Sequence, residues 1–172
     1  MGKGLPRSMA RANAQKSVIK KMMVRIDHTV TVTAVSTAVG FGSVVLSGLP
    51  EGQIKMLGAA VRLTVSGSGA DANLVDTWNG DFGIGTTPAD DATITGADVN
   101  MIASTALGAA VAEVAPTVNA INGTDAVFDN TDGSLEVNLN VLVDAADITD
   151  DESVDLTCEG VFEMTYITLL DD

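Results

Sequence analysis

Apolar and polar residues alternate along two parts of the chain, one near its beginning and one at its end. Residues 26–34 place Ile26, Val30 and Val32 on one side and Asp27 with three threonines on the other. Successive side chains of a β-strand point to opposite faces, so this period of two predicts a strand with one buried and one wet face. The same period runs through residues 135–143 and 154–164. These segments predict three long amphipathic strands.

Between these segments, shorter apolar runs and turn signals predict further strands. Residues 41–46 and 54–65 are mainly apolar, and the sequence GLPEG at residues 48–52 predicts a turn between them. Residues 66–73, rich in Ser and Gly, predict a loop. Asn79 and Gly80 separate residues 74–78 from 82–86, and this pair of residues tolerates the positive φ angles of a tight turn. We therefore expect a β-hairpin there.

The pattern of residues 87–131 is less regular. Residues 93–95 suit a short strand, and the Ala-rich residues 102–115 suit either a helix or a strand, of which we favour the strand. About eight strands, with turn signals between them and no long helix, predict an all-β fold. A sandwich or barrel of jelly-roll type is the usual arrangement of eight such strands. A chain of 172 residues suits one domain of this kind.

The first 25 residues differ from the rest in both pattern and charge. They hold seven of the nine Lys and Arg residues and no acid, whereas all 23 acidic residues follow them. Apolar residues from Ser8 to Ile26 share one helical face, with Ser8 as a cap. This pattern fits either a helix ordered by packing on a partner or a disordered basic tail. The sequence thus predicts a basic N-terminal arm, residues 1–25, and an acidic jelly-roll domain, residues 26–172.

The basic arm is the candidate binding segment. It is attracted to acidic surfaces, including the body of a sister subunit, whereas the acidic body repels nucleic acid and phospholipid head groups. We therefore expect self-association or docking on another protein, with no nucleic-acid and no membrane partner. The candidate partner-binding residues are Lys3, Arg7, Arg11, Lys16, Lys20, Lys21 and Arg25.

Signals for export and for membrane insertion are weak. The apolar run at residues 22–24 is too short for the core of a signal peptide. No segment has the roughly 20 continuous apolar residues of a spanning helix. Cys158 is the single cysteine, which excludes an internal disulfide and fits a reducing cytoplasm. We expect a soluble protein that is not exported.

The sequence offers few residues for catalysis or metal binding. His28, the only histidine, and Cys158 both occupy apolar positions of predicted strands, and neither a third orienting group nor a cleft is indicated. One His and one Cys cannot form a tetrahedral zinc site. Residues 129–133 hold oxygen ligands like those of half a calcium loop, but the distant bidentate glutamate is missing, so we favour a solvated turn and leave calcium as the alternative. We expect no enzyme, no cofactor and no metal site.

Three segments combine turn and strand residues in a distinctive way. They are GLPEGQIKMLGAA at residues 48–60, GDFGIGTTPADDATITG at 80–96 with STALG at 104–108, and DNTDGSLEVNLN at 129–140. In these phrases the chain resembles the jelly-roll decoration, or cement, proteins of tailed bacteriophages and related prophages. The resemblance covers roughly residues 40–172 and leaves the arm out. It implies a trimer of barrels on the outer shell between capsomers, bound to the major capsid protein, with no enzymatic residues.

These observations lead to the hypothesis of a structural virion protein, made in the cytoplasm of a bacterial host, that decorates the capsid and stabilises the phage head. One alternative is a fibre, spike-base or tail component of a virion. The other is a lectin-like carbohydrate-binding module, although one Trp, one Tyr and four Phe offer few aromatic platforms for a sugar.

Overall fold

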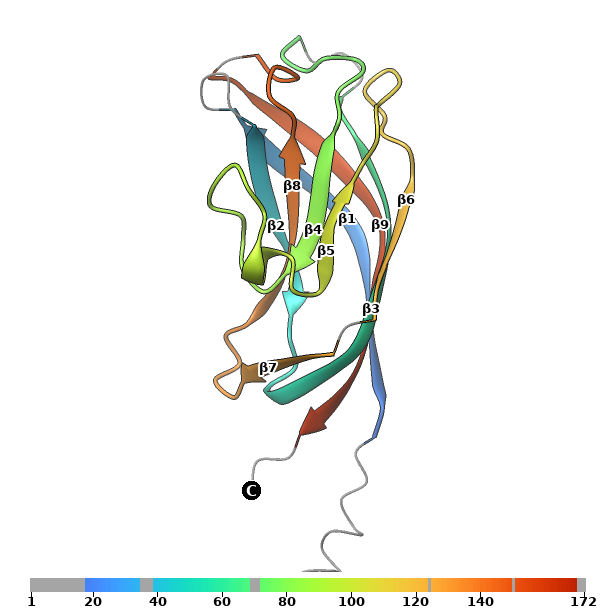
Figure 1. Cartoon of the computed structure of the whole chain (residues 1–172), viewed down its shortest axis with the longest axis vertical. Helices are drawn as coiled ribbons and strands as arrows, with labels where there is room; N and C mark the ends of the chain where they lie inside the picture. Colours follow the sequence, from blue (N-terminus) through green and yellow to red (C-terminus); the bar gives the residue numbers. More distant parts are fainter. Residues whose placement is uncertain (1–17, 35–38, 69–71, 124, 150, 170–172) are drawn as a thin grey trace, which may run out of the picture.

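The computed structural model describes residues 18–34, 39–68, 72–123, 125–149 and 151–169, and in these residues the fold is all-β (Figure 1). The jelly-roll type of sandwich or barrel predicted from the sequence is confirmed. No helix in these residues is long and apolar enough to cross a membrane. The strands are β1 (Lys20–Thr33), β2 (Gly40–Gly48), β3 (Gly52–Ser66), β4 (Gly80–Gly85), β5 (Ile102–Ala106), β6 (Val118–Asn122), β7 (Ala126–Asn130), β8 (Glu136–Val143) and β9 (Ser153–Leu169), with one 3-10 turn, η1 (Gly96–Asp98).

The strands form one sheet that bends into two layers and nearly closes. The strand order is β5-β4-β8-β2-β1-β9-β3-β6, with β7 pairing with β3, and all the pairs are antiparallel. β1 and β2 pair at Thr33 and Phe41, and from there the sheet divides into a β2-β8-β4-β5 layer and a β1-β9-β3-β6 layer (Figure 1). β5 and β6 are the two end strands of the sheet. Where they approach each other, the Asn122 side chain of β6 donates a hydrogen bond to the carbonyl of Met101, which precedes β5, at 2.9 Å. The two ends of the sheet are therefore tied together.

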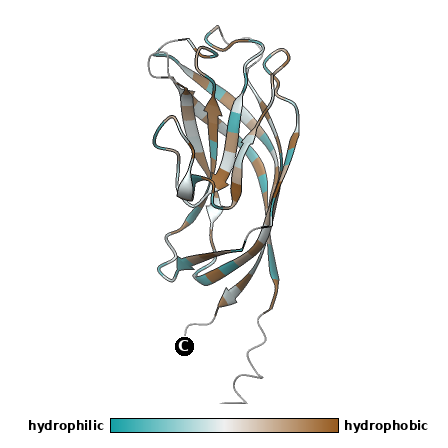
Figure 2. Ribbon diagram, in the orientation of Figure 1, coloured by the Kyte–Doolittle hydropathy of each residue, from teal (hydrophilic) through white to brown (hydrophobic). Residues whose placement is uncertain are grey.

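The core lies between the two layers and follows the predicted alternation. On β1, Ile26, Val30 and Val32 are buried, whereas the threonines and Asp27 between them are exposed. Figure 2 shows the corresponding hydrophobic and hydrophilic bands along the long strands. Trp78 and Phe82 are the largest of the fully buried side chains together with Phe162 of β9. The burial of these apolar side chains is the main contribution to stability.

The first strand begins earlier than its sequence pattern indicates. β1 starts at Lys20, so both arrangements considered above, the helix from Ser8 to Ile26 and the disordered tail, are wrong for the residues from Lys20 onward. The reason is tertiary: β9 is long enough to pair with all of β1, from Lys20 opposite Tyr166 to Thr33 opposite Ser153. This ladder satisfies the backbone hydrogen-bonding groups that a helix would otherwise satisfy. The earlier part of the expected helix lies outside the described residues.

The β-hairpin expected at Asn79 and Gly80 is also wrong. Gly80 is the first residue of β4, and β4 pairs with β8 on one edge and with β5 on the other. Both edges are taken, so residues 74–78 cannot fold back on β4. They run instead beside residues 110–113, where Ala110 N–H donates to Trp78 O at 2.8 Å and Glu113 N–H donates to Asp76 O at 2.9 Å.

The polar side of β8 is buried, although the sequence pattern predicts a wet face. Asn140 is fully buried, and its amide donates to the carbonyls of Thr87 and Asp98 at 3.0 and 2.8 Å. Its side-chain oxygen accepts the Ala89 N–H at 2.8 Å. Residues 86–100, which we call the covering loop, therefore lie over the outside of β8, and Asn140 holds them there.

The irregular middle of the chain is only partly as expected. Residues 102–106 form β5, as favoured, but residues 107–115 continue without regular structure apart from a tight turn, and residues 93–95 form no strand. β6 and β7 were not predicted. Each has five residues, and each pairs with the long strand β3. Such short segments carry too little periodicity to be recognised without their neighbours.

Candidate interaction surface

His28 and Cys158 lie opposite each other on β1 and β9. Cys158 is fully buried, and burial raises the pKa of its thiol to about 12, so the thiol stays protonated at neutral pH. A protonated thiol without access to solvent is a poor nucleophile. Cys158 therefore belongs to the core, as the sequence indicated, and His28 opposite it is half-buried.

The carboxylates of residues 129–133 are engaged in local turns. Asp129 accepts hydrogen bonds from the backbone and hydroxyl of Thr131, and Asp132 accepts from the backbone and hydroxyl of Ser134 at 3.0 and 2.8 Å. The Ser134 hydroxyl, with the backbone N–H, lowers the pKa of Asp132. These are the contacts of the solvated turn favoured above. Within the described ranges, no three His, Cys, Asp or Glu side chains gather as a metal-binding group.

The predicted arm residues divide into two sets. Lys3, Arg7, Arg11 and Lys16 lie outside the described residues. Lys20, Lys21 and Arg25 lie on β1, where Lys21 pairs with Glu163 at 2.7 Å and Arg25 with Asp27 at 3.0 Å. Lys20 donates to the Thr168 hydroxyl at 2.9 Å. These ion pairs are exposed, so each contributes at most about 1 kcal/mol to stability.

The outer side of the β1-β9-β3-β6 layer presents apolar side chains to solvent. The register of the strands places its outward residues in two adjacent rows, one of Met23, Glu163, Ala60 and Ile121 and one of Arg25, Val161, Arg62 and Asn119. We call these eight positions the outer face. Ile121 is 83% exposed, Met23 61% and Val161 38%. On β9, the alternation that buries Phe162 and Met164 places Val161 and Glu163 on the outward side.

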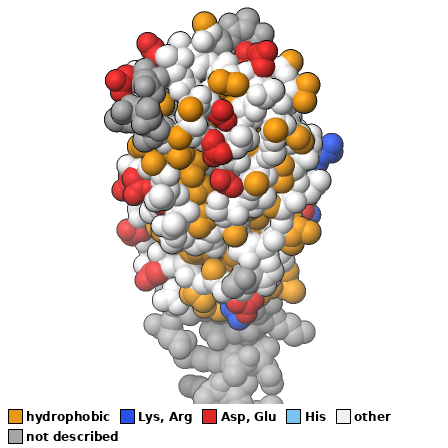
Figure 3. Space-filling view, turned by 45° about the horizontal axis from the view of Figure 1, so that its top comes forward, with side chains coloured by type: hydrophobic (Ala, Val, Ile, Leu, Met, Phe, Trp, Pro, Cys, Tyr) orange, Lys and Arg blue, Asp and Glu red, His pale blue; other side chains and the backbone are white. Residues whose placement is uncertain are grey.

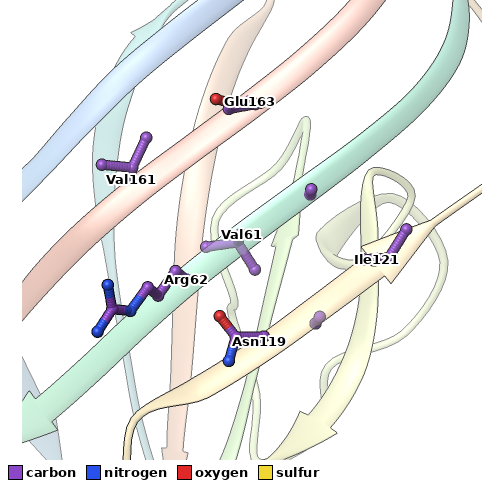
Figure 4. Close-up of a pocket in the computed structure, with 8 residues that line it drawn as sticks. Val61, Arg62, Asn119, Ile121, Val161 and Glu163 are labelled. Carbon is purple, nitrogen blue, oxygen red and sulfur yellow. The ribbon is translucent and has the colours of Figure 1, made fainter.

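An open hollow of about 220 Å³ lies in the outer face (Figure 4). Its lining comes from three neighbouring strands, with Val161 on β9, Arg62 on β3 and Ile121 on β6. A second hollow adjoins it and shares Ala60, Ile121 and Glu163. Together they form a shallow, mainly apolar depression that an apolar side chain of another protein can enter.

The charges of the molecule are segregated. In the described part of the chain the basic residues are Lys20, Lys21, Arg25, Lys55 and Arg62, and all five lie on β1 or β3. Acidic residues occur over the remaining surface. On the side shown in Figure 3, Asp and Glu side chains are spread over the surface, whereas Lys and Arg appear only at its right and lower margins. Two of these five basic residues, Arg25 and Arg62, belong to the outer face, together with one acidic residue, Glu163.

No protein-family model and no curated protein matches the chain. Among solved structures, a chain of the cyanophage Pam1 capsid asymmetric unit is 18% identical, with a TM-score of 0.40 over 89% of this chain and 86% of that chain. A chain of infectious bursal disease virus, Gt strain, is 8% identical, with a TM-score of 0.42 over 86% of this chain and 32% of that chain. A mutant VP2 protein of the same virus, in derived particles, is 10% identical, with a TM-score of 0.39 over 86% of this chain and 31% of that chain. The chain spans about a third of the length of these last two proteins.

The sequence pointed to only part of this surface. Of its residues, only Arg25 was singled out, together with Lys20 and Lys21 elsewhere on β1, because of its charge. Ile121, the most exposed large apolar residue in the described ranges, was missed because β6 was not predicted. The available signal was the isolated Val-Asn-Ala-Ile-Asn sequence of residues 118–122, which becomes informative only beside β3.

Proposed function

We propose that this chain is a structural, non-enzymatic protein of a virion. Within that class, we propose a decoration or cement protein that binds the major capsid protein on the outer shell between capsomers of a tailed-phage head. It acts as a homotrimer and is made in the cytoplasm of the bacterial host. Neither nucleic acid nor a membrane is part of this function.

The observation that carries the proposal is the outer face. It combines exposed apolar residues with Arg25 and Arg62, two of the five basic residues in the described part of an acidic chain, which is typical of a surface that binds protein. The hollow in this face is open and mainly apolar, with Arg62 and Glu163 as its charged lining residues. A shallow depression of this kind suits a side chain of a partner better than the enclosed binding of a small substrate.

The physical advantage of a trimer lies in its three equivalent attachment sites. Each site can be weak, because the second and third contacts form at a high effective concentration after the first. The basic residues of the arm add a long-range attraction to an acidic shell, which brings the protein to its site faster. Separation of the bridged capsomers then requires several contacts to break together.

The experiment is attachment of the full chain to purified undecorated shells at low and high salt. The test variant carries Lys3, Arg7, Arg11 and Lys16 replaced by Gln, which leaves all of β1 intact. We expect binding of this variant at low salt to be at least about tenfold weaker, because several ionic contacts are lost, and the difference to shrink at high salt through screening. A second variant, with Lys20, Lys21 and Arg25 replaced by Gln, separates the contribution of β1 from that of the preceding residues.

Equal binding of the first variant and the unchanged protein at both salt concentrations would remove these four residues from the mechanism. Failure of the unchanged protein to bind shells at any salt concentration would contradict the decoration function itself.

A further inference from the structure

We propose that the outer face is the surface through which one copy of this chain contacts a second copy, and that it meets an acidic surface of that copy. This inference deepens the self-association contained in the proposed function and rests on it. It assigns the contact to particular residues of β1, β9, β3 and β6.

The first argument is the apolar content of the face. Ile121 and Met23 stand at the two ends of one row, on the outermost strands of the layer, and Val161 lies in the neighbouring row between them. Within the described residues, this layer has no other element packed over its outward side comparable to the covering loop that lies over β8. Contact with another protein would remove these apolar side chains from water, which favours association.

The second argument is charge. Arg25 and Arg62 flank Val161 in a single row, because both pair with it across the strands. The face also holds Glu163, so two copies meeting face to face would bring four arginines and only two glutamates into one interface, and this excess of positive charge is unfavourable. The face therefore favours a partner surface of opposite sign.

The chain itself supplies such a surface. In the described residues, every Lys and Arg lies on β1 or β3, so a surface formed by the other strands and loops presents acidic residues without any basic ones. The covering loop is one example, with Asp90, Asp91 and Asp98. A contact between the outer face of one copy and a different surface of the next is head-to-tail, and repeated head-to-tail contacts close into a ring when the rotation between copies is a whole fraction of a turn. A trimer is the smallest such ring.

The test measures the mass of the full chain in solution by analytical ultracentrifugation over a range of concentrations. Two variants, Ile121→Glu and Met23→Glu, each place a negative charge in the apolar part of the face. Because both side chains are mostly exposed, neither substitution disturbs the core, and circular dichroism against temperature checks the fold of each. Val111→Glu is the matched control: Val111 is 77% exposed but lies in the turn after β5, outside the outer face.

We expect the unchanged protein and Val111→Glu to form trimers, and the two face variants to associate at least 100-fold more weakly. Arg62→Glu should weaken association most at low salt, since its contribution is ionic. Trimers of unaltered strength in both face variants would overturn the inference, and so would an unchanged protein that stays monomeric at all concentrations. A dimer of the unchanged protein would overturn the head-to-tail contact.

Attachment to undecorated shells distinguishes this inference from the proposed function. Face variants that keep the trimer but no longer bind shells would assign the outer face to the capsid, which overturns the inference and leaves the function standing. Loss of the trimer in the face variants, together with no shell binding by the unchanged protein, would support the inference and contradict the function.

Discussion

Asn140 shows how one buried polar side chain fixes the position of a long loop. It makes three hydrogen bonds to the backbone of the covering loop, at Thr87, Ala89 and Asp98. In Asn140→Leu these three partly buried backbone groups lose their partner, so we expect a loss of about 3 kcal/mol in the free energy of unfolding. Urea denaturation measures the loss, and Thr29→Leu on the exposed side of β1, outside the outer face, is the control. A loss in Asn140→Leu no larger than that of the control would show that the loop is held by other contacts.

A second prediction at this scale concerns the tight turn between Val111 and Val114. Its two central residues, Ala112 and Glu113, have φ angles of 50° and 63°, in the left-handed region that favours glycine. Ala112→Gly should therefore stabilise the protein by about 0.5 kcal/mol, because relief of strain exceeds the entropy that glycine adds to the unfolded chain. Ala103→Gly, in the extended backbone of β5, should destabilise it instead. Thermal unfolding of both variants tests the contrast, and a lower melting temperature for Ala112→Gly would contradict it.

At the scale of elements, the close approach of β9 to its neighbours depends on Gly160. This residue pairs with Ile26 of β1 and with Leu63 of β3 in the middle of the long strands. A Cβ atom at this position would lie 1.9 Å from the Arg62 carbonyl oxygen, which is far inside contact distance. Glycine is therefore required for these strands to pair at this point.

We expect Gly160→Ala to cost about 3 kcal/mol, because β3 and β9 must separate or distort to admit the methyl group. Gly48→Ala, at the exposed end of β2, is a matched control with nothing within 4 Å of the added atom. The free energy of unfolding of the two variants is the measurement. A small and equal effect in both would mean that the β3-β9 pairing relaxes easily.

At the scale of the whole molecule, the net charge is −14, so repulsion between neighbouring carboxylates lowers the stability of the folded state. Asp144, which follows β8, is a carboxylate that lies near two other acidic residues. Partial burial, followed by the charges of Asp81 and Asp147, raises its pKa above the usual value of 3.8. Because the folded state then binds the proton more tightly than the unfolded state, ionised Asp144 lowers stability above its folded pKa, and this cost disappears as the pH falls below about 3.8.

Asp144→Asn should therefore stabilise the protein near pH 7 and have no effect near pH 3. The gain is small, below about 0.5 kcal/mol, because the side chain is largely exposed and its interactions are screened. Melting temperatures across this pH range give the measurement. Asp90→Asn, which removes one charge from the covering loop, controls for net charge. A gain that is independent of pH, or equal in the control, would contradict a local origin at Asp144.

The long strands could be predicted from the sequence, and the short ones could not. In β1 and β9, a period of two persists over many residues, so that Ile26, Val30 and Leu156 identify the buried side without help from neighbours. β6 and β7 have five residues each and become strands because β3 offers them an edge. The basic residues of β1 were recognisable by charge, but Ile121 joins them in one surface only through the pairing of β6 with β3 and of β3 with β9.

The sequence alone determined that this protein is all-β, that its core is built mainly from Val, Ala, Leu, Ile and Met, and that its charges are divided between a basic beginning and an acidic remainder. These are local properties, since side-chain alternation and composition do not depend on which strands meet. The tertiary structure decided which strand edges pair. This pairing places Gly80 at the start of β4 instead of in a hairpin turn, buries Asn140 and brings the residues of the outer face together. The reason is that strand pairing joins residues far apart in the chain, and the pattern of a single segment holds no information about its partner.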